Sequence, residues 1–283
     1  MEKLGLSGDT IAIDGNFIIK TCQTNQERFI KNTIKQEKFN NIYIKSVLIV
    51  ERGIIDNKNY IKMPYLECDN SIIWLSKTNI NNFYEFEYKL LNYLDNLFIN
   101  SEIKEFNYDI WVNKIIDLED KIVDETIKDI LSIFKNLQFK QLFYYGDYHG
   151  DFTLSNLLVY NKEKSVNIEA IDFLESFIDS PINDIVKLRQ DTKHLWTLNL
   201  LKEFDDINKN RVVIFLNHID DKLNQLIKNN IILQEYYLPF QILNLIRIIP
   251  YNKDNKIFLY LKREIERLFY EFNINNAMCR KIC

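Results

Sequence analysis

The chain has 283 residues, of which 47% are apolar and 27% are charged, and its formal net charge at pH 7 is −4. This length and apolar content suit one large domain or two lobes with a sizeable core. Because the charge balance is slightly acidic, no global positive field would attract nucleic acid, and we expect no nucleic-acid partner.

Neither a signal peptide nor a membrane span is predicted. The N-terminal residues lack the apolar core that a signal peptide needs. The most apolar run, residues 240–250, is interrupted by Gln241, Asn244 and Arg247, so it cannot cross a bilayer. We therefore expect a cytoplasmic protein without a membrane partner.

The first part of the chain shows strand patterns. Apolar and polar side chains alternate over residues 10–13 and 16–22, and an Asp-Gly pair between them is typical of a tight hairpin turn. Two further strands are predicted over residues 42–50 and 60–65.

A helix is expected between these two pairs of strands, over residues 26–39. Thr24 or Asn25 can cap its N-terminus, because a short polar side chain there accepts a backbone N–H. The apolar residues that the spacing places on one face are Phe29, Ile30 and Ile34.

Beyond these strands the pattern becomes helical. Apolar residues recur at three- and four-residue spacing over 82–97 and 118–137, and helices resume at residue 182. Between these helical stretches, the apolar runs 157–160 and 166–173 predict a small hairpin.

Together the patterns predict an α+β protein in two parts. Residues 1–66 are expected to form a small β-sheet lobe with one helix. Residues 67–283 are expected to form a larger, mainly helical lobe, joined to the first by an extended segment over residues 63–69.

The most informative string is His-Gly-Asp-Phe-Thr-Leu-Ser-Asn at residues 149–156, followed by Ile-Asp-Phe at residues 171–173. It places Asp151 and Asn156 on one loop, and Asp172 across the predicted hairpin. Phosphoryl transfer needs such groups, because a carboxylate must orient and deprotonate the attacking hydroxyl while hard oxygen ligands hold Mg²⁺ against the phosphates. Capping residues in a helical protein would explain each aspartate singly, but not the ordered set.

This ordered set resembles the aminoglycoside phosphotransferase and choline kinase group, which has the protein-kinase-like two-lobe fold. The resemblance implies an enzyme that uses ATP and Mg²⁺ to move the γ-phosphate to a hydroxyl of a small molecule: a sugar, polyol, amino alcohol or aminoglycoside. By position in the motif, Asp151 is then the catalytic base, and Asn156 and Asp172 are the metal ligands. His149 is expected to hold the loop by packing and hydrogen bonding.

The resemblance also implies nucleotide-binding residues near the N-terminus. Ser7 and Gly8 lie in a glycine-containing segment suited to covering phosphates, and Lys20 resembles the strand lysine that contacts the α- and β-phosphates. The helical glutamate that pairs with this lysine is either Glu27 or Glu37, and their spacings do not decide between them. A simple turn and a solvated lysine are the alternative interpretations.

The segment Met63-Pro64-Tyr65-Leu66 lies where such kinases bind adenine. In that arrangement Met63 is the gatekeeper, Pro64 accepts through its carbonyl, and Leu66 donates its N–H. A proline suits this role because it keeps its carbonyl. An edge strand that ends at a proline would explain the same residues.

One residue departs from the family pattern, and one segment points to the acceptor. Thr153 stands where protein kinases carry a lysine and aminoglycoside phosphotransferases often a histidine. Positive charge at the γ-phosphate must then come from Mg²⁺, from Lys20 or from an arginine elsewhere.

Residues 185–191 loosely resemble kinase-like proteins of bacterial surface-polysaccharide gene clusters, which favours a sugar, polyol or amino alcohol.

Two other classes of protein share parts of this pattern. A nucleotide-binding pseudokinase with a regulatory or scaffold role would lack the base or a metal ligand, whereas all three are present here. A protein kinase needs an activation loop that docks a peptide, and too few residues separate Phe173 from Pro181 for one. The small-molecule kinase is therefore the preferred prediction.

Overall fold

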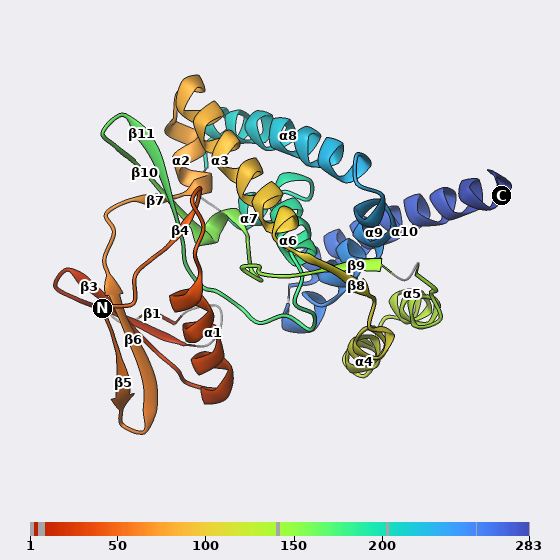
Figure 1. Cartoon of the computed structure of the whole chain (residues 1–283), viewed down its shortest axis with the longest axis horizontal. Coiled ribbons are helices and arrows are strands. Elements are labelled where there is room, and N and C mark those ends of the chain that lie inside the picture. Colours follow the sequence, from red (N-terminus) through yellow and green to blue (C-terminus); the bar gives the residue numbers. More distant parts are fainter. Residues whose placement is uncertain (1–2, 5–8, 140–141, 202–203, 253, 283) are drawn as a thin grey trace. The chain divides into compact units, whose positions relative to one another are not determined.

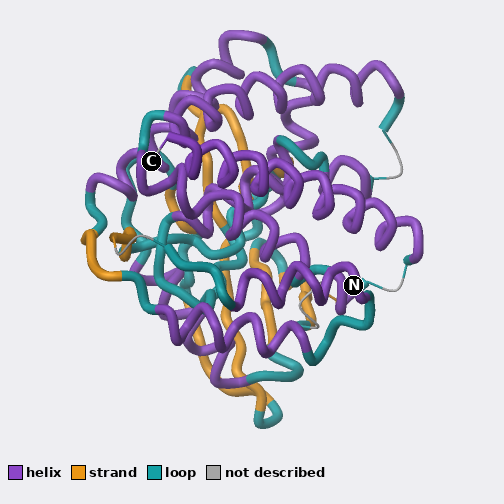
Figure 2. Tube along the Cα trace, turned by 90° about the vertical axis from the view of Figure 1, so that its right-hand side faces the viewer, coloured by secondary structure: helices purple, strands orange, loops and turns teal. Residues whose placement is uncertain are grey.

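A computed structural model describes most of the chain. Helices make up most of its trace, as Figure 2 shows. The described residues are 3–4, 9–139, 142–201, 204–252 and 254–282.

The chain packs as two compact units, each assembled from three separate segments of the sequence. The segments of unit 1 are Met1–Asn96, His149–Glu175 and Thr197–Phe215. Those of unit 2 are Leu97–Tyr148, Ser176–Trp196 and Leu216–Cys283. These units are defined by packing, and the predicted division between residues 66 and 67, into a nucleotide-binding β-sheet lobe and a larger helical lobe, stays a prediction.

Unit 1 contains a five-stranded antiparallel sheet, coloured red to orange in Figure 1. Its strands are β1 (Lys3–Leu4), β2 (Thr10–Asp14), β3 (Phe17–Thr21), β5 (Glu51–Ile55) and β6 (Lys58–Pro64), in the order β1-β2-β3-β6-β5. Its tight turns have positive φ angles, 58° at Gly15, 50° at Asp56 and 60° at Asn57. Glycine, aspartate and asparagine tolerate this conformation best, so the predicted β2–β3 hairpin forms where its Asp-Gly pair indicated.

The strand predicted over residues 42–50 is wrong in its extent. Only β4 (Lys45–Ser46) is a strand there, and it pairs with β11 (Ser165–Ala170) in a second sheet. The strand that pairs with β6 is β5, which the sequence pattern did not indicate. Because β5 is an edge strand whose Ile54 is 70% exposed, burial imposes no alternation on its sequence.

Helix α1 (Gln26–Lys38) packs against β6. It occupies the residues predicted for it, but the face that it buries is not the predicted one. Asn25 caps it, and its side chain accepts the N–H of Arg28. The buried residues are Phe29, Thr33 and Gln36, whereas Ile30 is 43% exposed. Polar residues occupy this face because hydrogen bonds satisfy them: Thr33 donates to the Phe29 carbonyl, and Gln36 donates to the Val47 carbonyl.

The predicted hairpin after residue 156 forms the centre of the second sheet of unit 1. It consists of β10 (Leu157–Lys162) and β11, which pair in antiparallel register from Leu157 opposite Ala170 to Lys162 opposite Ser165. With β4 and β7 (Asp69–Asn70), the strand order is β4-β11-β10-β7. The last three residues of the predicted run, 171–173, leave the strand and turn.

Unit 1 also includes helical segments. Helices α2 (Ser71–Lys77) and α3 (Ile80–Ile99) follow β7, and α3 covers the predicted helix 82–97. Helix α7 (Trp196–Leu200) leads to the first part of α8 (Asp206–Lys228). The start of α8 packs on α3, where the Phe215 and Phe83 rings stack with centroids 4.2 Å apart.

Unit 2 is mainly helical. The single helix predicted over 118–137 is wrong, because two helices with a break at residues 120–124 occupy this region. Asp124 starts the second helix, since its side chain accepts the N–H of Ile127 and caps the new N-terminus. The elements are α4 (Tyr108–Glu119), α5 (Glu125–Lys135), α6 (Ile182–Thr192), α9 (Ile231–Ile246), α10 (Asn255–Ile282), β8 (Glu102–Glu105) and β9 (Leu142–Tyr145).

Aromatic side chains form the core of unit 2. The Phe106 ring lies 5.0 Å from each of the rings of Phe139, Phe143 and Tyr236. Trp111 is fully buried among them, and its indole N–H donates to the Phe134 carbonyl. Within the described part of the chain, no helix has the length and apolar character to traverse a bilayer.

Candidate active site

The 149–156 loop lies in unit 1, directly before β10. Gly150 has a φ of 90°, a conformation that suits glycine and allows the chain to reverse after His149. The loop closes on itself, because the N–H of Thr153 donates to the Asp151 carbonyl and that of Asn156 donates to the Thr153 carbonyl. It ends in a 3₁₀ turn, Leu154–Asn156, that leads into β10.

His149 holds this loop, as the sequence predicted, through two hydrogen bonds of its ring. The backbone N–H of Asp151 donates to Nδ1 at 3.2 Å, so Nδ1 is the acceptor and the proton is on Nε2. Nε2 then donates to the Ile171 carbonyl at 2.9 Å. The neutral ring thus ties the loop to the chain beyond β11, and it is completely buried.

Contacts between aromatic rings hold the 149–156 loop in place. The His149 ring lies 4.2 Å from the Phe173 ring, and Phe173 contacts Phe39 at 4.8 Å. Phe152 contacts Tyr93 of α3 at 4.5 Å. The rings of His149 and Phe152 thus lie in the core, whereas Asp151 and Asn156 are only partly buried.

Asp151 and Asn156 are joined directly. The side-chain nitrogen Nδ2 of Asn156 donates to the Asp151 carbonyl at 2.8 Å and to its carboxylate oxygen Oδ2 at 3.0 Å. Because the amide nitrogen makes both bonds, the amide oxygen Oδ1 is the atom that Asn156 can offer to a cation. The same bonds orient the Asp151 carboxylate, which is what a base that receives a proton from a hydroxyl requires.

Asp172 lies beside this pair, because the Ile171 N–H donates to the Asn156 carbonyl at 3.0 Å. Its φ is 61°, an uncommon conformation for a residue other than glycine. The turn directs Phe173 into the core, while the Asp172 carboxylate stays 40% exposed and accepts a hydrogen bond from Lys20 Nζ at 2.7 Å. Residues distant in sequence thus meet at one place.

Lys20 on β3 has a second carboxylate near it. Its Nζ lies 3.7 Å from Oδ2 of Asp9, which directly precedes β2. Burial alone would lower the pKa of Lys20, but Asp172 and then Asp9 outweigh it, so that the pKa is raised and the ammonium stays charged. Sequence reasoning missed Asp9, since no motif marks an acidic residue at that position.

Neither glutamate considered for Lys20 is its partner. Glu27 pairs with Lys31 at 2.9 Å, one turn along α1. Glu37 pairs with Arg52 of β5, also at 2.9 Å. Helix α1 instead contacts the chain after Asp172, where Lys35 donates to the Leu174 carbonyl and the Glu175 N–H donates to Asn32.

The residues predicted to contact adenine lie at the end of β6. Pro64 is its last residue, so its carbonyl marks the point where the chain leaves the sheet. Met63 is buried, and Leu66 packs on the same apolar cluster. Around them are partly exposed apolar side chains from several strands and from the chain after β11, namely Ile18, Ile49, Leu158 and Ile171. Ser7 and Gly8 lie outside the described residues.

The oxygen atoms of Asn156 and Asp172 have the chemistry that Mg²⁺ prefers. Magnesium in phosphoryl-transfer sites takes one or two protein ligands and fills its other positions with water and phosphate oxygens. Among the described residues, no group of three or more His, Cys, Asp or Glu side chains could hold a metal ion. Asn156 and Asp172 therefore offer two oxygen ligands, a number that suits Mg²⁺.

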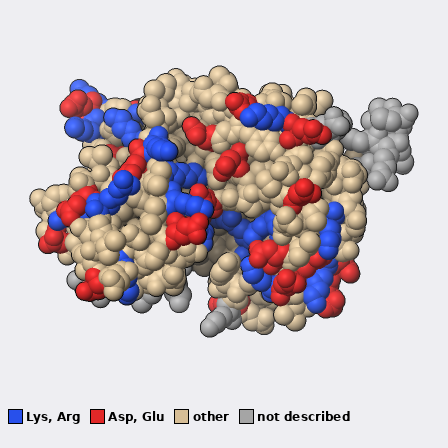
Figure 3. Space-filling view, turned by 60° about the horizontal axis from the view of Figure 1, so that its bottom comes forward, with Lys and Arg blue, Asp and Glu red and all other residues tan. Residues whose placement is uncertain are grey.

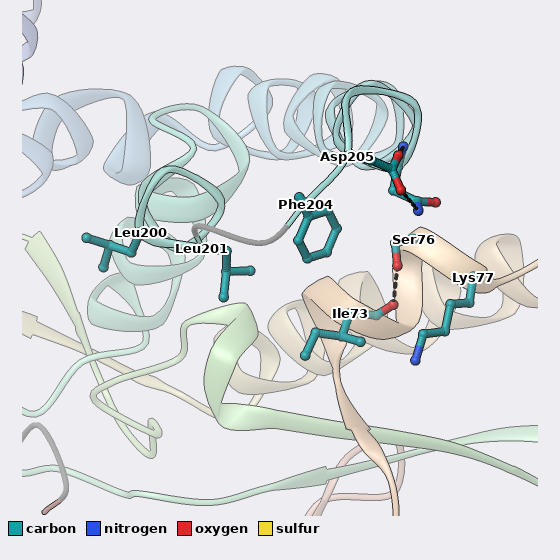
Figure 4. Close-up of a pocket in the computed structure, with 8 residues that line it drawn as sticks. Ile73, Ser76, Lys77, Leu200, Leu201, Phe204 and Asp205 are labelled. Carbon is teal, nitrogen blue, oxygen red and sulfur yellow. Dashed lines mark hydrogen bonds between the residues drawn. The ribbon is translucent and has the colours of Figure 1, made fainter.

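A separate cavity of about 400 Å³ lies between α2 and the α7–α8 region of unit 1 (Figure 4). Its polar groups are occupied locally: Ser76 donates to the Ile73 carbonyl, and the Asp205 carboxylate accepts from Asn208. None of the residues discussed above lines it. The cavity is therefore not part of the candidate site, and nothing in it points to a ligand.

Charges of both signs are mixed on the surface. On the face shown in Figure 3, Lys and Arg are interspersed with Asp and Glu. Among the described residues on this face, the Lys and Arg side chains form no continuous area.

Solved structures similar to this chain include several aminoglycoside phosphotransferases. The GDP complex of wild-type aminoglycoside 2'-phosphotransferase-IIIa has a TM-score of 0.53 at 15% identity, and the match covers 95% of this chain and 90% of that chain. A GDP and kanamycin complex of APH(2")-IIia has a TM-score of 0.54 at 14% identity, with coverages of 94% and 90%. Aminoglycoside phosphotransferase APH(4)-Ia has a TM-score of 0.55 at 11% identity, with coverages of 92% and 88%.

At identities this low, the likeness establishes the fold. The chain has the α+β, protein-kinase-like fold of the aminoglycoside phosphotransferases, as the sequence predicted. No family model matches the sequence, and no curated protein sequence matches it. Function must therefore be argued from the site.

Proposed function

We propose that this protein is an ATP- and Mg²⁺-dependent phosphotransferase that moves the γ-phosphate to a hydroxyl of a small molecule. One observation carries the proposal: the bonded pair Asp151–Asn156 and the ion pair Lys20–Asp172 adjoin each other in one compact unit. Phosphoryl transfer depends on positioning and charge, and this arrangement supplies both.

Each residue has a defined role in the proposal. Asp151 orients the acceptor hydroxyl and takes its proton, while Asn156 keeps the carboxylate in place. Asn156 Oδ1 and the Asp172 carboxylate would hold Mg²⁺, which when bound neutralises phosphate charge. Lys20 contacts the α- and β-phosphates. Thr153 is buried and carries no charge, so the loop itself adds no cation at the γ-phosphate.

The nucleotide is proposed to bind residues 1–66, and residues 67–283 are proposed to carry the 149–156 loop and the acceptor pocket. Pro64 would accept from the adenine amine through its carbonyl, Leu66 would donate its N–H, and Ser7 and Gly8 would cover the phosphates. Leu158 and Ile171 provide apolar surface for the base. The similar structures hold GDP with kanamycin in one case and GDP in another, which supports a nucleotide and a hydroxylated acceptor.

The acceptor is proposed to be a sugar, polyol, amino alcohol or aminoglycoside, met in the cytoplasm where ATP is available. The test is ATP consumption by the purified protein with Mg²⁺, measured against a panel of these four classes. We expect turnover with at least one class. Nucleotide binding without turnover for any acceptor would contradict the proposal and indicate a pseudokinase.

The variant Asp151→Asn separates catalysis from binding. Loss of the base should reduce turnover by about 10²- to 10⁴-fold, while nucleotide affinity stays near that of the wild type. Asp56→Asn, the same change at an exposed turn of the β5–β6 hairpin, is the matched control and should leave turnover unchanged. Full turnover by Asp151→Asn would show that Asp151 is not the base.

A further inference from the structure

The ammonium of Lys20 lies between two carboxylates that come from different parts of unit 1. Asp172 follows β11, and Asp9 precedes β2. The distances from Lys20 Nζ are 2.7 Å to Asp172 Oδ1 and 3.7 Å to Asp9 Oδ2. The glutamates of α1 are engaged with Lys31 and Arg52, so the helix supplies no counter-ion to this lysine.

The two carboxylates differ in their access to solvent. The Asp172 side chain is 40% exposed, whereas those of Asp9 and Lys20 are 12% and 15% exposed. A hydrated magnesium ion can therefore reach Asp172 more readily than Asp9. If Asp172 ligates the ion, the metal competes with Lys20 for that carboxylate, and the lysine needs a second anchor.

Asp9 is held by the sheet, so it can serve as such an anchor. Its Oδ1 accepts the N–H of Gln23 at 3.4 Å, just beyond the end of β3. Gln23 in turn donates to the hydroxyl of Thr10 at 2.8 Å. Asp9 lies two residues before Ile11, which pairs with Lys20 in the β2–β3 register, so the β2–β3 hairpin brings Asp9 near Lys20. Their separation therefore does not depend on the position of a helix.

We propose that Asp9 is the positioning residue that holds Lys20 against the nucleotide phosphates, in the place of a helix α1 glutamate. The inference rests on the proposed nucleotide-binding function. In this arrangement Lys20 keeps Asp9 as a carboxylate partner when Asp172 ligates the metal. The lysine therefore points at the phosphates regardless of the position of α1.

The test is equilibrium binding of Mg²⁺–ATP, which needs no knowledge of the acceptor. Asp9→Asn keeps the size of the side chain and an oxygen for Gln23, but removes the charge beside Lys20. Two effects oppose each other: less negative charge favours an anionic ligand, whereas an unanchored lysine binds it less well. At 3.7 Å the two charges are within ion-pair range, and both side chains are largely buried, so we expect the second effect to dominate and the affinity to fall by about tenfold.

Three further variants make the assignment specific. Glu27→Gln and Glu37→Gln should bind Mg²⁺–ATP like the wild type. Asp9→Glu, which restores the charge, should recover part of the affinity. In a Lys20→Met background, Asp9→Asn should cause no additional loss, because its effect passes through the lysine. A purely structural role for Asp9 would instead weaken binding equally in both backgrounds.

The outcomes distinguish this inference from the proposed function. If the wild type binds Mg²⁺–ATP and Asp9→Asn binds it equally well, Asp9 does not position Lys20, although the phosphotransferase proposal stands. The same conclusion follows if Glu27→Gln or Glu37→Gln causes the loss. If the wild type itself binds no nucleotide, the proposed function fails, and the role of Asp9 fails with it.

Discussion

Asp172 has a backbone conformation that few aspartates adopt, and its neighbours explain why it persists. A φ of 61° costs about 1–3 kcal/mol for a non-glycine residue. The turn places Phe173 against His149 in the core and the carboxylate of Asp172 on Lys20. The residues on either side of the turn thus determine its direction, and the strain lies in the candidate site itself.

The variant Asp172→Asn should weaken Mg²⁺–nucleotide binding by about ten- to a hundredfold, because the amide is a poorer ligand for a hard cation. Asparagine tolerates positive φ, so the backbone should be retained. Calorimetric titration with ATP at increasing Mg²⁺ concentration measures the effect. Asp56→Asn, also at a positive φ, is the control; equal affinity for Asp172→Asn and the wild type would exclude a ligand role.

Among the residues of the candidate site, those that belong to one sequence motif could be predicted. Asp151, Asn156 and Asp172 were predicted from one motif, and in the structure Asn156 bonds to Asp151 while the residue before Asp172 bonds to Asn156; their catalytic and metal-binding roles stay predictions. Asp9 was not found, because its approach to Lys20 depends on strand pairing and not on spacing along the chain. The partner of Lys20 was therefore sought on α1, where neither Glu27 nor Glu37 contacts it.

Elements were predictable where local chemistry decides them. The β2–β3 hairpin and the cap of α1 follow from an Asp-Gly turn and from Asn25. The other elements depend on how distant parts of the chain bury them. The edge strand β5 has no buried face that its pattern could reveal. The break between α4 and α5 was missed because apolar residues recur at three- and four-residue spacing through most of residues 118–137.

Helices α6 and α10 of unit 2 are joined by a titratable pair. His194, just after α6, lies 2.9 Å from Glu264 of α10, which also pairs with Arg267. The hydrogen bond from His194 is the main cause that lowers the pKa of Glu264 from 4.5 to about 2. Burial lowers the pKa of His194, so its neutral ring donates from Nδ1 to the carboxylate.

Glu264 should therefore stabilise the protein in a defined pH range. Because its pKa is lower in the folded state, the contribution is complete above pH 4.5 and is lost as the pH falls toward about 2. Glu264→Gln should lower the free energy of unfolding by about 2 kcal/mol at pH 7, and by less at pH 3. Urea denaturation at both pH values measures this difference.

Glu266→Gln, an exposed position on the same helix, is the matched control and should have little effect at either pH. A loss for Glu264→Gln that does not change with pH would show that packing, and not the charge of Glu264, accounts for its contribution.

For the whole molecule, bound nucleotide should appear as added stability. A ligand at a hundred times its Kd stabilises the folded state by about 2.7 kcal/mol, which corresponds to an increase in Tm of roughly 4–5 °C for a chain of this size. We expect this increase with Mg²⁺–ATP and not with Mg²⁺ alone. Calorimetric melting measures it.

The division into two compact units predicts which part of the molecule the nucleotide should stabilise. All of the described residues of the candidate site lie in unit 1, so if the units melt in separate steps only the step of unit 1 should shift. Asp172→Asn should abolish most of the shift. A shift confined to unit 2 would place the nucleotide elsewhere in the molecule.

The sequence predicted the class of fold, because a strand-rich start followed by helical periodicity is visible without long-range information. It did not predict that each compact unit takes three segments of the chain. Such grouping arises from contacts between distant residues, as where the 149–156 loop packs its Phe152 on Tyr93 of α3.

This interleaving of segments has a consequence for how the protein is made. Unit 1 begins at the N-terminus, yet it is complete only when Phe215 has been added, long after its sheet has left the ribosome. At about 5–20 residues per second, the apolar surface that receives the 149–175 segment stays uncovered for several seconds. During this time the nascent chain has Lys20 and Asp9 but lacks the 149–175 segment, and the apolar surface that this segment covers is exposed to chaperones. A product truncated before residue 149 lacks the segment that covers this surface.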